Sequence, residues 1–129
     1  MTQQRPDAPQ DRAVLPDRVA VVVVGAGQAG LATSACLRAR SIDHVLLERS
    51  VVGHSWKHER WASLRTLTPN WMTQLPGLGP DLVAGGRADF DPDGFDTAAD
   101  VGRTLDSYAR SIDAPVFEGC EVHDVARRN

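Results

Sequence analysis

The 129-residue chain lacks most of the features that mark secreted, membrane or nucleic-acid-binding proteins. Its two cysteines, Cys36 and Cys120, lie far apart and form no C-x-x-C pair, so we expect buried free thiols in a reducing compartment. No apolar run approaches the roughly 20 residues that a membrane span needs, and the N-terminus lacks the apolar core of a signal peptide. A net charge of −3 excludes a strongly basic surface for nucleic acid. We therefore expect a soluble, cytoplasmic, single-domain protein.

The most informative stretch present is residues 19–48. Residues 19–24 are apolar and mostly β-branched, which predicts a strand buried on both faces. Gly25, Gly27 and Gly30 follow in Gly-x-Gly-x-x-Gly spacing, and a helical segment and a second strand over 44–47 come next. The first glycine permits a tight turn, the second a close approach to a pyrophosphate, and the third close packing of helix on sheet. The pattern predicts an α/β fold with a parallel sheet and a Rossmann-like βαβ unit.

Two further features of this unit point to a dinucleotide. Glu48 ends the second strand 23 residues after Gly25, where a carboxylate can accept hydrogen bonds from ribose hydroxyls. The helix N-terminus offers free N–H groups and a partial positive charge to phosphates. The alternative is a glycine-rich turn that binds nothing. Ser41 stands near the helix end, where a glycine is usual, so we expect a strained turn there.

The rest of the chain is less regular. Residues 1–18 are polar and rich in proline, which predicts a disordered tail. Trp56, Trp61 and Trp71 fall in a segment without a sustained period, and they either pin a long loop to the sheet or line a cofactor cavity. On a helix, His54 and His58 could share a metal ion with a third ligand such as Glu59. The segment does not look helical and the rest of a ligand pattern is missing, so we predict no metal site. Residues 79–88 are expected to be a flexible connector.

Residues 89–100 match the spacing of an EF-hand calcium loop, but no helix precedes them. We favour a turn that leads into a helix, with Thr97 and Asp100 forming a capping box. Apolar residues then recur on one helical face and predict core packing: Val101, Leu105, Tyr108, Ala109 and Ile112. Strands are expected over 116–118 and 121–126.

The region from Glu48 to Gly77 carries a family resemblance. Its motifs are Glu48-Arg49, Gly53, Trp56, Arg60-Trp61, Ser63-Leu64-Arg65, Leu67-Thr68-Pro69-Asn70-Trp71 and Leu75-Pro76-Gly77. Together they resemble the N-terminal FAD-binding domain of flavin-containing monooxygenase-like NAD(P)/FAD-dependent oxidoreductases, chiefly a bacterial branch of flavoproteins. The resemblance runs from about residue 19 to about residue 128 and is looser over 79–91. His54 departs from it, because many relatives carry a second glycine there.

The resemblance implies FAD as cofactor, with NADPH or NADH as co-substrate only in a full-length form. In such enzymes a C4a-peroxyflavin passes oxygen to a small-molecule substrate, and we assign no catalytic side chain to this chain. The implied cofactor-binding residues are Gly25, Ala26, Gly27, Gln28, Ala29 and Gly30 at the pyrophosphate, Glu48 and Arg49 at the adenosine ribose, Trp56 along the ribityl chain, Leu67 and Thr68 near the isoalloxazine, and Val122 at the adenine.

A full-length member of the family is expected to continue with a second glycine-rich motif for NADPH, which this sequence does not contain. We therefore expect residues 19–129 to be a partial FAD-binding domain that does not turn over alone and that can self-associate through an incomplete sheet. Two alternatives stay open. One is an NAD-binding dehydrogenase or reductase half, since Glu48 disfavours NADP although Arg49 leaves an opening for it. The other is a non-enzymatic nucleotide-binding module.

Overall fold

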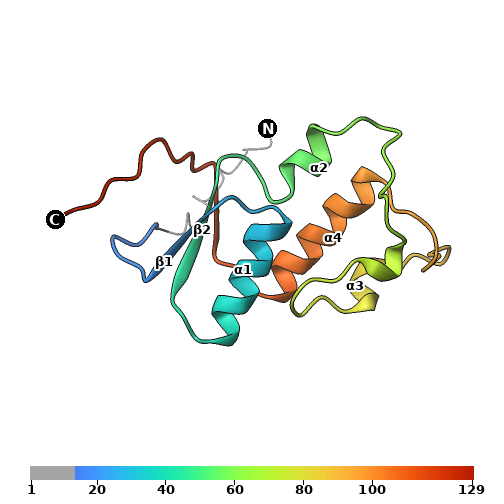
Figure 1. Cartoon of the computed structure of the whole chain (residues 1–129), viewed down its shortest axis with the longest axis horizontal. Coiled ribbons are helices and arrows are strands. Elements are labelled where there is room, and N and C mark those ends of the chain that lie inside the picture. Colours follow the sequence, from blue (N-terminus) through green and yellow to red (C-terminus); the bar gives the residue numbers. More distant parts are fainter. Residues whose placement is uncertain (1–13) are drawn as a thin grey trace, which may run out of the picture.

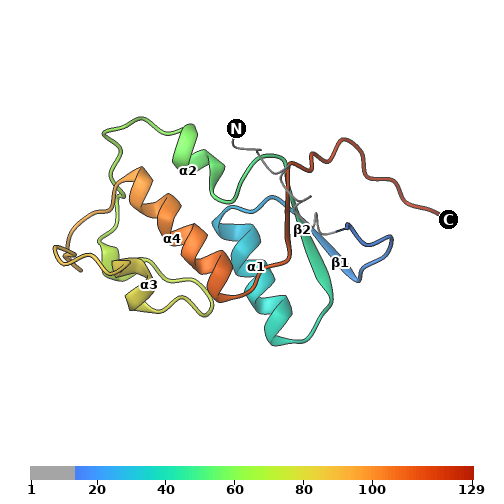
Figure 2. The same ribbon diagram turned by 180° about the vertical axis from the view of Figure 1, so that it is seen from behind.

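A computed structural model describes residues 14–129 of the chain. The elements in order are β1 (Val21–Val24), α1 (Gln28–Ala39), β2 (His44–Glu48), α2 (His54–His58), the 3-10 helix η1 (Asn70–Met72), α3 (Pro80–Ala84), α4 (Ala98–Ser111) and β3 (Val116–Glu118). The strands form one parallel sheet in the order β1-β2-β3. Helix α1 packs on β1 and β2, and α4 packs on α1 and α2 beyond it (Figure 1; from behind in Figure 2). The predicted α/β fold with a parallel sheet and a βαβ unit is confirmed.

Strand β1 is shorter and more exposed than predicted. Val21 and Val23 are half-buried, and Val23 contacts the core, whereas Val22 and Val24 are 50% and 63% exposed. The prediction of a strand buried on both faces was therefore wrong. The reason is its position in the sheet: within residues 14–129 no other strand pairs with the outer edge of β1.

Helix α1 ends in the strained turn predicted at Ser41. The Ser41 N–H donates to the Arg38 carbonyl and the Ile42 N–H donates to the Leu37 carbonyl, which is the Schellman pattern. This pattern places Ser41 at φ 53°, in the left-handed region that favours glycine. A non-glycine residue therefore holds the helix end at a cost in conformational energy.

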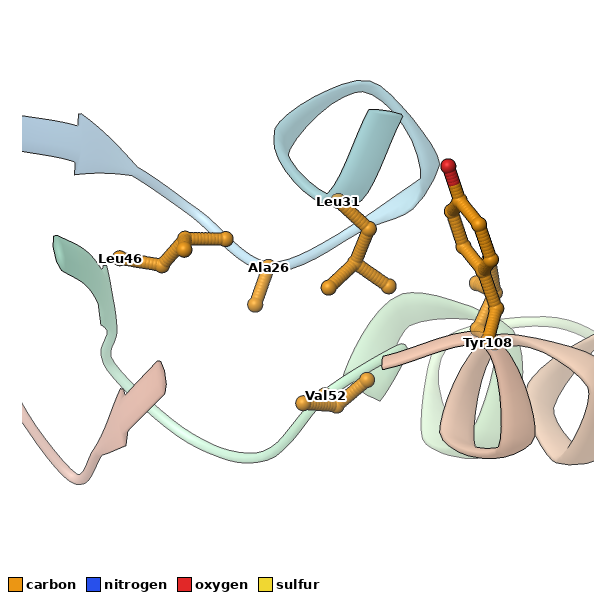
Figure 3. Close-up of a cluster of buried hydrophobic side chains, with 6 residues drawn as sticks. Ala26, Leu31, Leu46, Val52 and Tyr108 are labelled. Atoms are coloured by element: carbon orange, nitrogen blue, oxygen red, sulfur yellow. The ribbon is translucent and has the colours of Figure 1, made fainter. Parts of the chain in front are cut away.

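The core joins the first βαβ unit to α4 (Figure 3). Its buried members are Ala26, Leu31, Leu46, Val52, Leu105 and Tyr108, and Val101, Ala109 and Ile112 pack around them, which confirms the predicted face of α4. The Tyr108 hydroxyl donates to the Pro76 carbonyl at 2.5 Å. Burial raises the pKa of Tyr108, and the nearby Cys36 raises it further. Tyr108 thus ties the turn around Pro76 to the core.

Three local predictions were wrong. The expected connector contains α3, because Pro80 opens the helix at its first turn and Gly85 closes it at φ 60°. His54 and His58 do lie on a helix, α2, which begins after Gly53 at φ 67°. Residues 121–126 form no strand, because a strand needs a ladder partner and this tail leaves the sheet after Cys120 (Figure 1). Residues 1–13 of the predicted tail lie outside the described part, and residues 14–18 are exposed without helix or strand.

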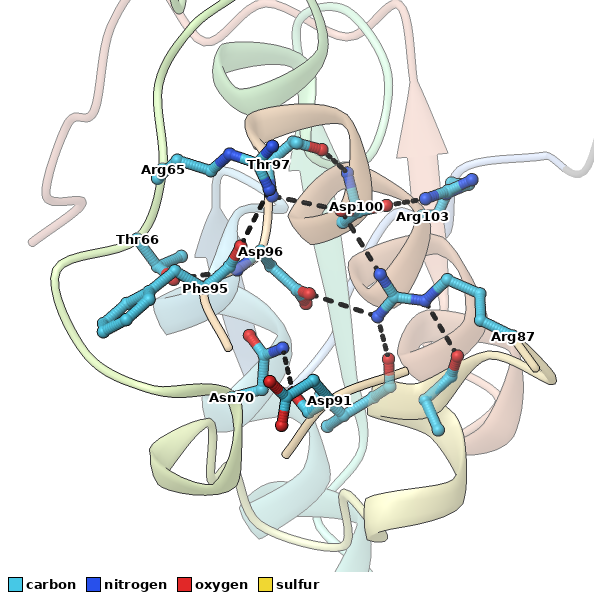
Figure 4. A network of polar contacts seen from close by, with 12 residues as sticks. Arg65, Thr66, Asn70, Arg87, Asp91, Phe95, Asp96, Thr97, Asp100 and Arg103 are labelled. Atoms are coloured by element: carbon cyan, nitrogen blue, oxygen red, sulfur yellow. Dashed lines mark hydrogen bonds and ion pairs between the residues drawn. The ribbon is translucent and has the colours of Figure 1, made fainter. Parts of the chain in front are cut away.

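A polar network fixes residues 65–97 against the start of α4 (Figure 4). Arg87 pairs with Asp96 at 3.1 Å and with Asp100 at 3.3 Å. Asp100 also completes the predicted capping box, because its side chain accepts from the Thr97 N–H and its own N–H donates to the Thr97 hydroxyl. The carboxylate at the last position of the calcium-loop pattern is thus engaged in helix capping and ion pairs. The geometry favours the turn and cap over a calcium loop.

Candidate functional site

The segments that follow the three strands meet at the carboxyl edge of the sheet. The Gly25 N–H donates to the Leu47 carbonyl at 2.8 Å, and the Cys120 N–H donates to the Glu48 carbonyl at 2.9 Å. The Gly53 N–H donates to the Ala26 carbonyl at 3.1 Å, which attaches the start of α2 to the turn after β1. In open α/β sheets the crevice outside this edge is where ligands bind.

The three glycines of the turn have distinct physical roles. Gly25 has φ 98°, which side chains rarely tolerate, so it permits the tight turn out of β1. A Cβ on Gly30 would stand 2.1 Å from the Gly25 carbonyl oxygen, so Gly30 lets α1 lie close to the turn. A Cβ on Gly27 would meet nothing within 4 Å. Gly27 therefore serves no packing purpose inside the protein, and its open side is the place where a ligand can approach the backbone.

The N-terminus of α1 faces this open side with unused donors. Gly27 caps the helix without a side-chain hydrogen bond, and the first turn contains no acidic residue. Within residues 14–129, the first N–H of α1 that has a protein acceptor is that of Leu31, which donates to the Gly27 carbonyl. The N–H groups of Gln28, Ala29 and Gly30 have no such acceptor. Three free donors and the positive end of the helix dipole make a site for an anion such as a phosphate.

Glu48 links the end of β2 to the same turn. One oxygen of its carboxylate accepts the Ala26 N–H at 3.1 Å, and the other accepts the Ser50 N–H at 2.7 Å. Each oxygen keeps a second lone pair, and the side chain is only half-buried, so Glu48 can accept two further hydrogen bonds from hydroxyl groups. An acceptor for hydroxyls thus lies beside a site for an anion, which is what a ribose joined to a phosphate requires.

Sequence reasoning missed Glu118 as part of this edge. Its carboxylate accepts the Val52 N–H at 3.0 Å, so the end of β3 holds the loop that follows β2. Glu118 is the register partner of Glu48, and Gly119 follows it at φ 69°. An acidic residue and a glycine directly after a short apolar run were the available signal.

The remaining predicted residues are less closely associated with the turn. Trp56 is half-buried against the core, with the Arg60 guanidinium 4.9 Å from its ring centroid. Leu67 is 98% exposed, and the loop between α2 and η1 on which it lies runs on the side of the molecule away from the sheet (Figure 1). Thr68 beside it is also exposed, and Val122 is half-buried in the C-terminal segment.

The tryptophans do not act as a group. Trp56 packs on the core, whereas Trp61 and Trp71 are mostly exposed, so neither of these two pins its loop. The rings of His54 and His58 lie 4.9 Å apart on α2. Across residues 14–129, no group of three or more His, Cys, Asp or Glu side chains is arranged to hold a metal ion. No helix in that range is long and apolar enough to cross a membrane.

Comparison with known proteins adds independent information. No protein-family model matches the chain. An uncharacterized CzcO-like oxidoreductase of Geobacillus kaustophilus is 32% identical over 105 residues, which cover 81% of this chain and 28% of that protein. Indole-3-pyruvate monooxygenase YUCCA6 of Arabidopsis thaliana is 42% identical over 66 residues, 47% of this chain and 16% of that protein.

The structure of a flavin-containing monooxygenase from Stenotrophomonas maltophilia superimposes with a TM-score of 0.70 at 29% identity. The match covers 86% of this chain and 31% of that one. The chain thus spans less than a third of the length of these relatives.

Proposed function

The chain is a relative of the flavin-containing monooxygenase-like oxidoreductases, and from that premise we propose that it is the FAD-binding portion of an NAD(P)H-dependent flavoprotein of monooxygenase type. The observation that carries the proposal is the contact between Glu48 and the turn at Ala26, next to the open side of Gly27. In FAD the adenosine ribose is joined directly to the pyrophosphate. Glu48 can therefore meet the ribose while the turn at Gly27 meets the pyrophosphate.

The proposed contacts run outward from the carboxyl edge of the sheet. Backbone groups of residues 25–30 hold the pyrophosphate, Glu48 accepts hydrogen bonds from the adenosine ribose beside Arg49, and the Val122 backbone meets the adenine. Trp56 lies along the ribityl chain, and Leu67 and Thr68 contact the isoalloxazine, for which a fully exposed leucine is a suitable apolar surface. FAD supplies the redox chemistry when bound, while these residues bind and orient it and exclude water.

The activity of a longer protein is a separate part of the proposal. Reduction by NADPH or NADH and transfer of oxygen to a small molecule would need a second nucleotide motif, and this sequence offers none. The chain spans under a third of the length of its relatives. We expect no turnover from residues 1–129 alone, and steady NADPH oxidation by the purified chain would contradict this. The proposed location is the cytoplasm, where the free thiols of Cys36 and Cys120 would stay reduced.

A pair of glycine variants tests whether FAD binds at the turn around Gly27. Gly27 and Gly79 both cap helices at similar φ, −86° and −82°, and a Cβ on either meets nothing within 4 Å. Gly27→Ala places its methyl group where the pyrophosphate would bind, whereas Gly79→Ala lies at the start of α3. We expect both variants to fold like the parent, and FAD to raise the melting temperature of the parent and of Gly79→Ala but not of Gly27→Ala.

The readouts are thermal melts with FAD or NAD and the absorbance of cofactor released from the purified protein. Colourless protein whose melting temperature FAD leaves unchanged would refute the proposal. A rise with NAD but not with FAD would favour the dehydrogenase half instead. Equal loss of the FAD response in both glycine variants would show that the response does not come from the turn at Gly27.

We also propose that copies of the chain associate along β1. Its outer edge is unpaired within residues 14–129, and its four residues are all valine. Natural edge strands usually carry charge or proline that prevents such pairing. A second copy can offer the same edge in an antiparallel arrangement, so the contact is self-complementary.

A further inference from the structure

The polar groups beside Glu48 form a continuous chain of contacts that ends on Arg49. The Ser50 N–H donates to Glu48 at 2.7 Å, and the Ser50 hydroxyl lies 2.8 Å from His54 Nδ1. The other ring nitrogen, Nε2, lies 3.5 Å from Oε1 of Glu59. The same oxygen lies 3.6 Å from Nη2 of Arg49. The Glu59 carboxylate therefore contacts two side chains, that of Arg49 directly after β2 and that of His54 at the start of α2.

The backbone explains why Glu59 lies within reach of Arg49. Gly53 starts α2 in a left-handed conformation and donates its N–H to the Ala26 carbonyl, so the helix is attached to the glycine turn. Glu59 is the C-cap of this five-residue helix, and His54 is its first residue. His54, the residue that departs from the family pattern, thus bonds to Ser50 on one side and approaches Glu59 on the other.

The charge of this cluster bears on which dinucleotide fits. An arginine near the ribose accommodates the 2′-phosphate of NADP, whereas a carboxylate repels it. Arg49 directly follows Glu48, so an unpaired Arg49 would offer such a phosphate a partner. In the structure its charge is shared with Glu59, and the formal charges of Glu48, Arg49 and Glu59 sum to −1.

We propose that Glu59 strengthens the preference of the proposed nucleotide site for dinucleotides with a free 2′-hydroxyl. By holding Arg49 it withdraws the cation that a 2′-phosphate would need, and His54 helps to keep Glu59 in place. This inference rests on the proposed nucleotide site and adds to it a preference at the ribose. Glu59 acts through Arg49, so it is a positioning residue.

The test compares NAD⁺ with NADP⁺, which differ only in the 2′-phosphate, as competitors for FAD bound to the full chain. The measured quantity is the ratio of their dissociation constants. Because Arg49 and Glu59 are 66% and 49% exposed, the expected effect is modest: Glu59→Gln lowers the preference for NAD⁺ about two- to fivefold. Glu59→Asp keeps the charge and should retain most of the preference, and Glu59→Gln combined with Arg49→Ala should restore it.

Asp113→Asn is the matched control, because it removes one negative charge from an exposed ion pair, with Arg38, at the far end of α1. An unchanged ratio in Glu59→Gln, or an equal change in Asp113→Asn, would overturn the inference. If FAD does not bind, the proposed function fails, and the ratio is then measured by direct titration of NAD⁺ and NADP⁺. Absence of binding by both would overturn this inference as well.

Discussion

Gly30→Ala tests whether the third glycine of the turn is required for packing. The new Cβ would stand 2.1 Å from the Gly25 carbonyl oxygen and 3.0 Å from its carbonyl carbon, while ordinary contact begins at 3.4 Å. The turn cannot easily move away, because the Gly25 N–H is held by the Leu47 carbonyl at 2.8 Å. Helix α1 must therefore shift outward from the sheet by roughly 1 Å to restore contact distances.

The expected cost combines two opposing effects. Overpacking of a well-packed site destabilises by about 1–3 kcal/mol, and replacing glycine by alanine in a helix recovers up to about 1 kcal/mol. We expect Gly30→Ala to lower the free energy of unfolding by about 1–2 kcal/mol. For a chain of this size the melting temperature should fall by about 4 °C per kcal/mol. Chemical denaturation of the protein without added cofactor measures the effect.

Gly102→Ala provides the matched control. Gly102 is a buried glycine of α4, whereas Gly30 is half-buried, and a Cβ on Gly102 would stand 2.8 Å from Cγ of Lys57. That neighbour is a side-chain carbon of Lys57, whose Nζ is held by Asp106 at 2.7 Å, so the Lys57 side chain must adjust but no backbone has to move. The loss of stability should therefore be smaller than in Gly30→Ala. If Gly30→Ala proves as stable as Gly102→Ala, the close approach between α1 and the turn does not require glycine and the reasoning is refuted.

Three further changes have definite expected outcomes. Tyr108→Phe should lower the free energy of unfolding by about 1 kcal/mol, because it leaves the Pro76 carbonyl unpaired. Since the pKa of Tyr108 is raised in the folded state, the parent should lose this advantage as pH rises above 10. A stability difference that does not change with pH in denaturant titrations would contradict this. Ser41→Gly should stabilise by about 0.5–1 kcal/mol, because it removes left-handed strain, and a lower melting temperature would contradict this. Val22→Lys should abolish the concentration-dependent association of the parent in sedimentation experiments; association that persists unchanged would exclude β1 as the interface.

The local sequence determined the elements that depend on neighbouring residues. The glycine spacing predicted the turn, α1 and the placement of Glu48, because a tight turn, a helix start and a strand end are each set by a few adjacent residues. The capping box at Thr97 and Asp100 and the apolar face of α4 were predicted for the same reason. Even the strained conformation of Ser41 followed from its position after the helix.

Only the tertiary structure decided what distant residues do together. The exposure of β1 depends on which strands flank it, and the failure of residues 121–126 to form a strand depends on whether a ladder partner exists. The contact of Glu118 with Val52 and the capture of Arg49 by Glu59 join residues that sequence spacing does not relate. Local patterns fix the backbone of the glycine turn, but the charges beside Glu48, where the ribose would bind, are set by packing between separate elements.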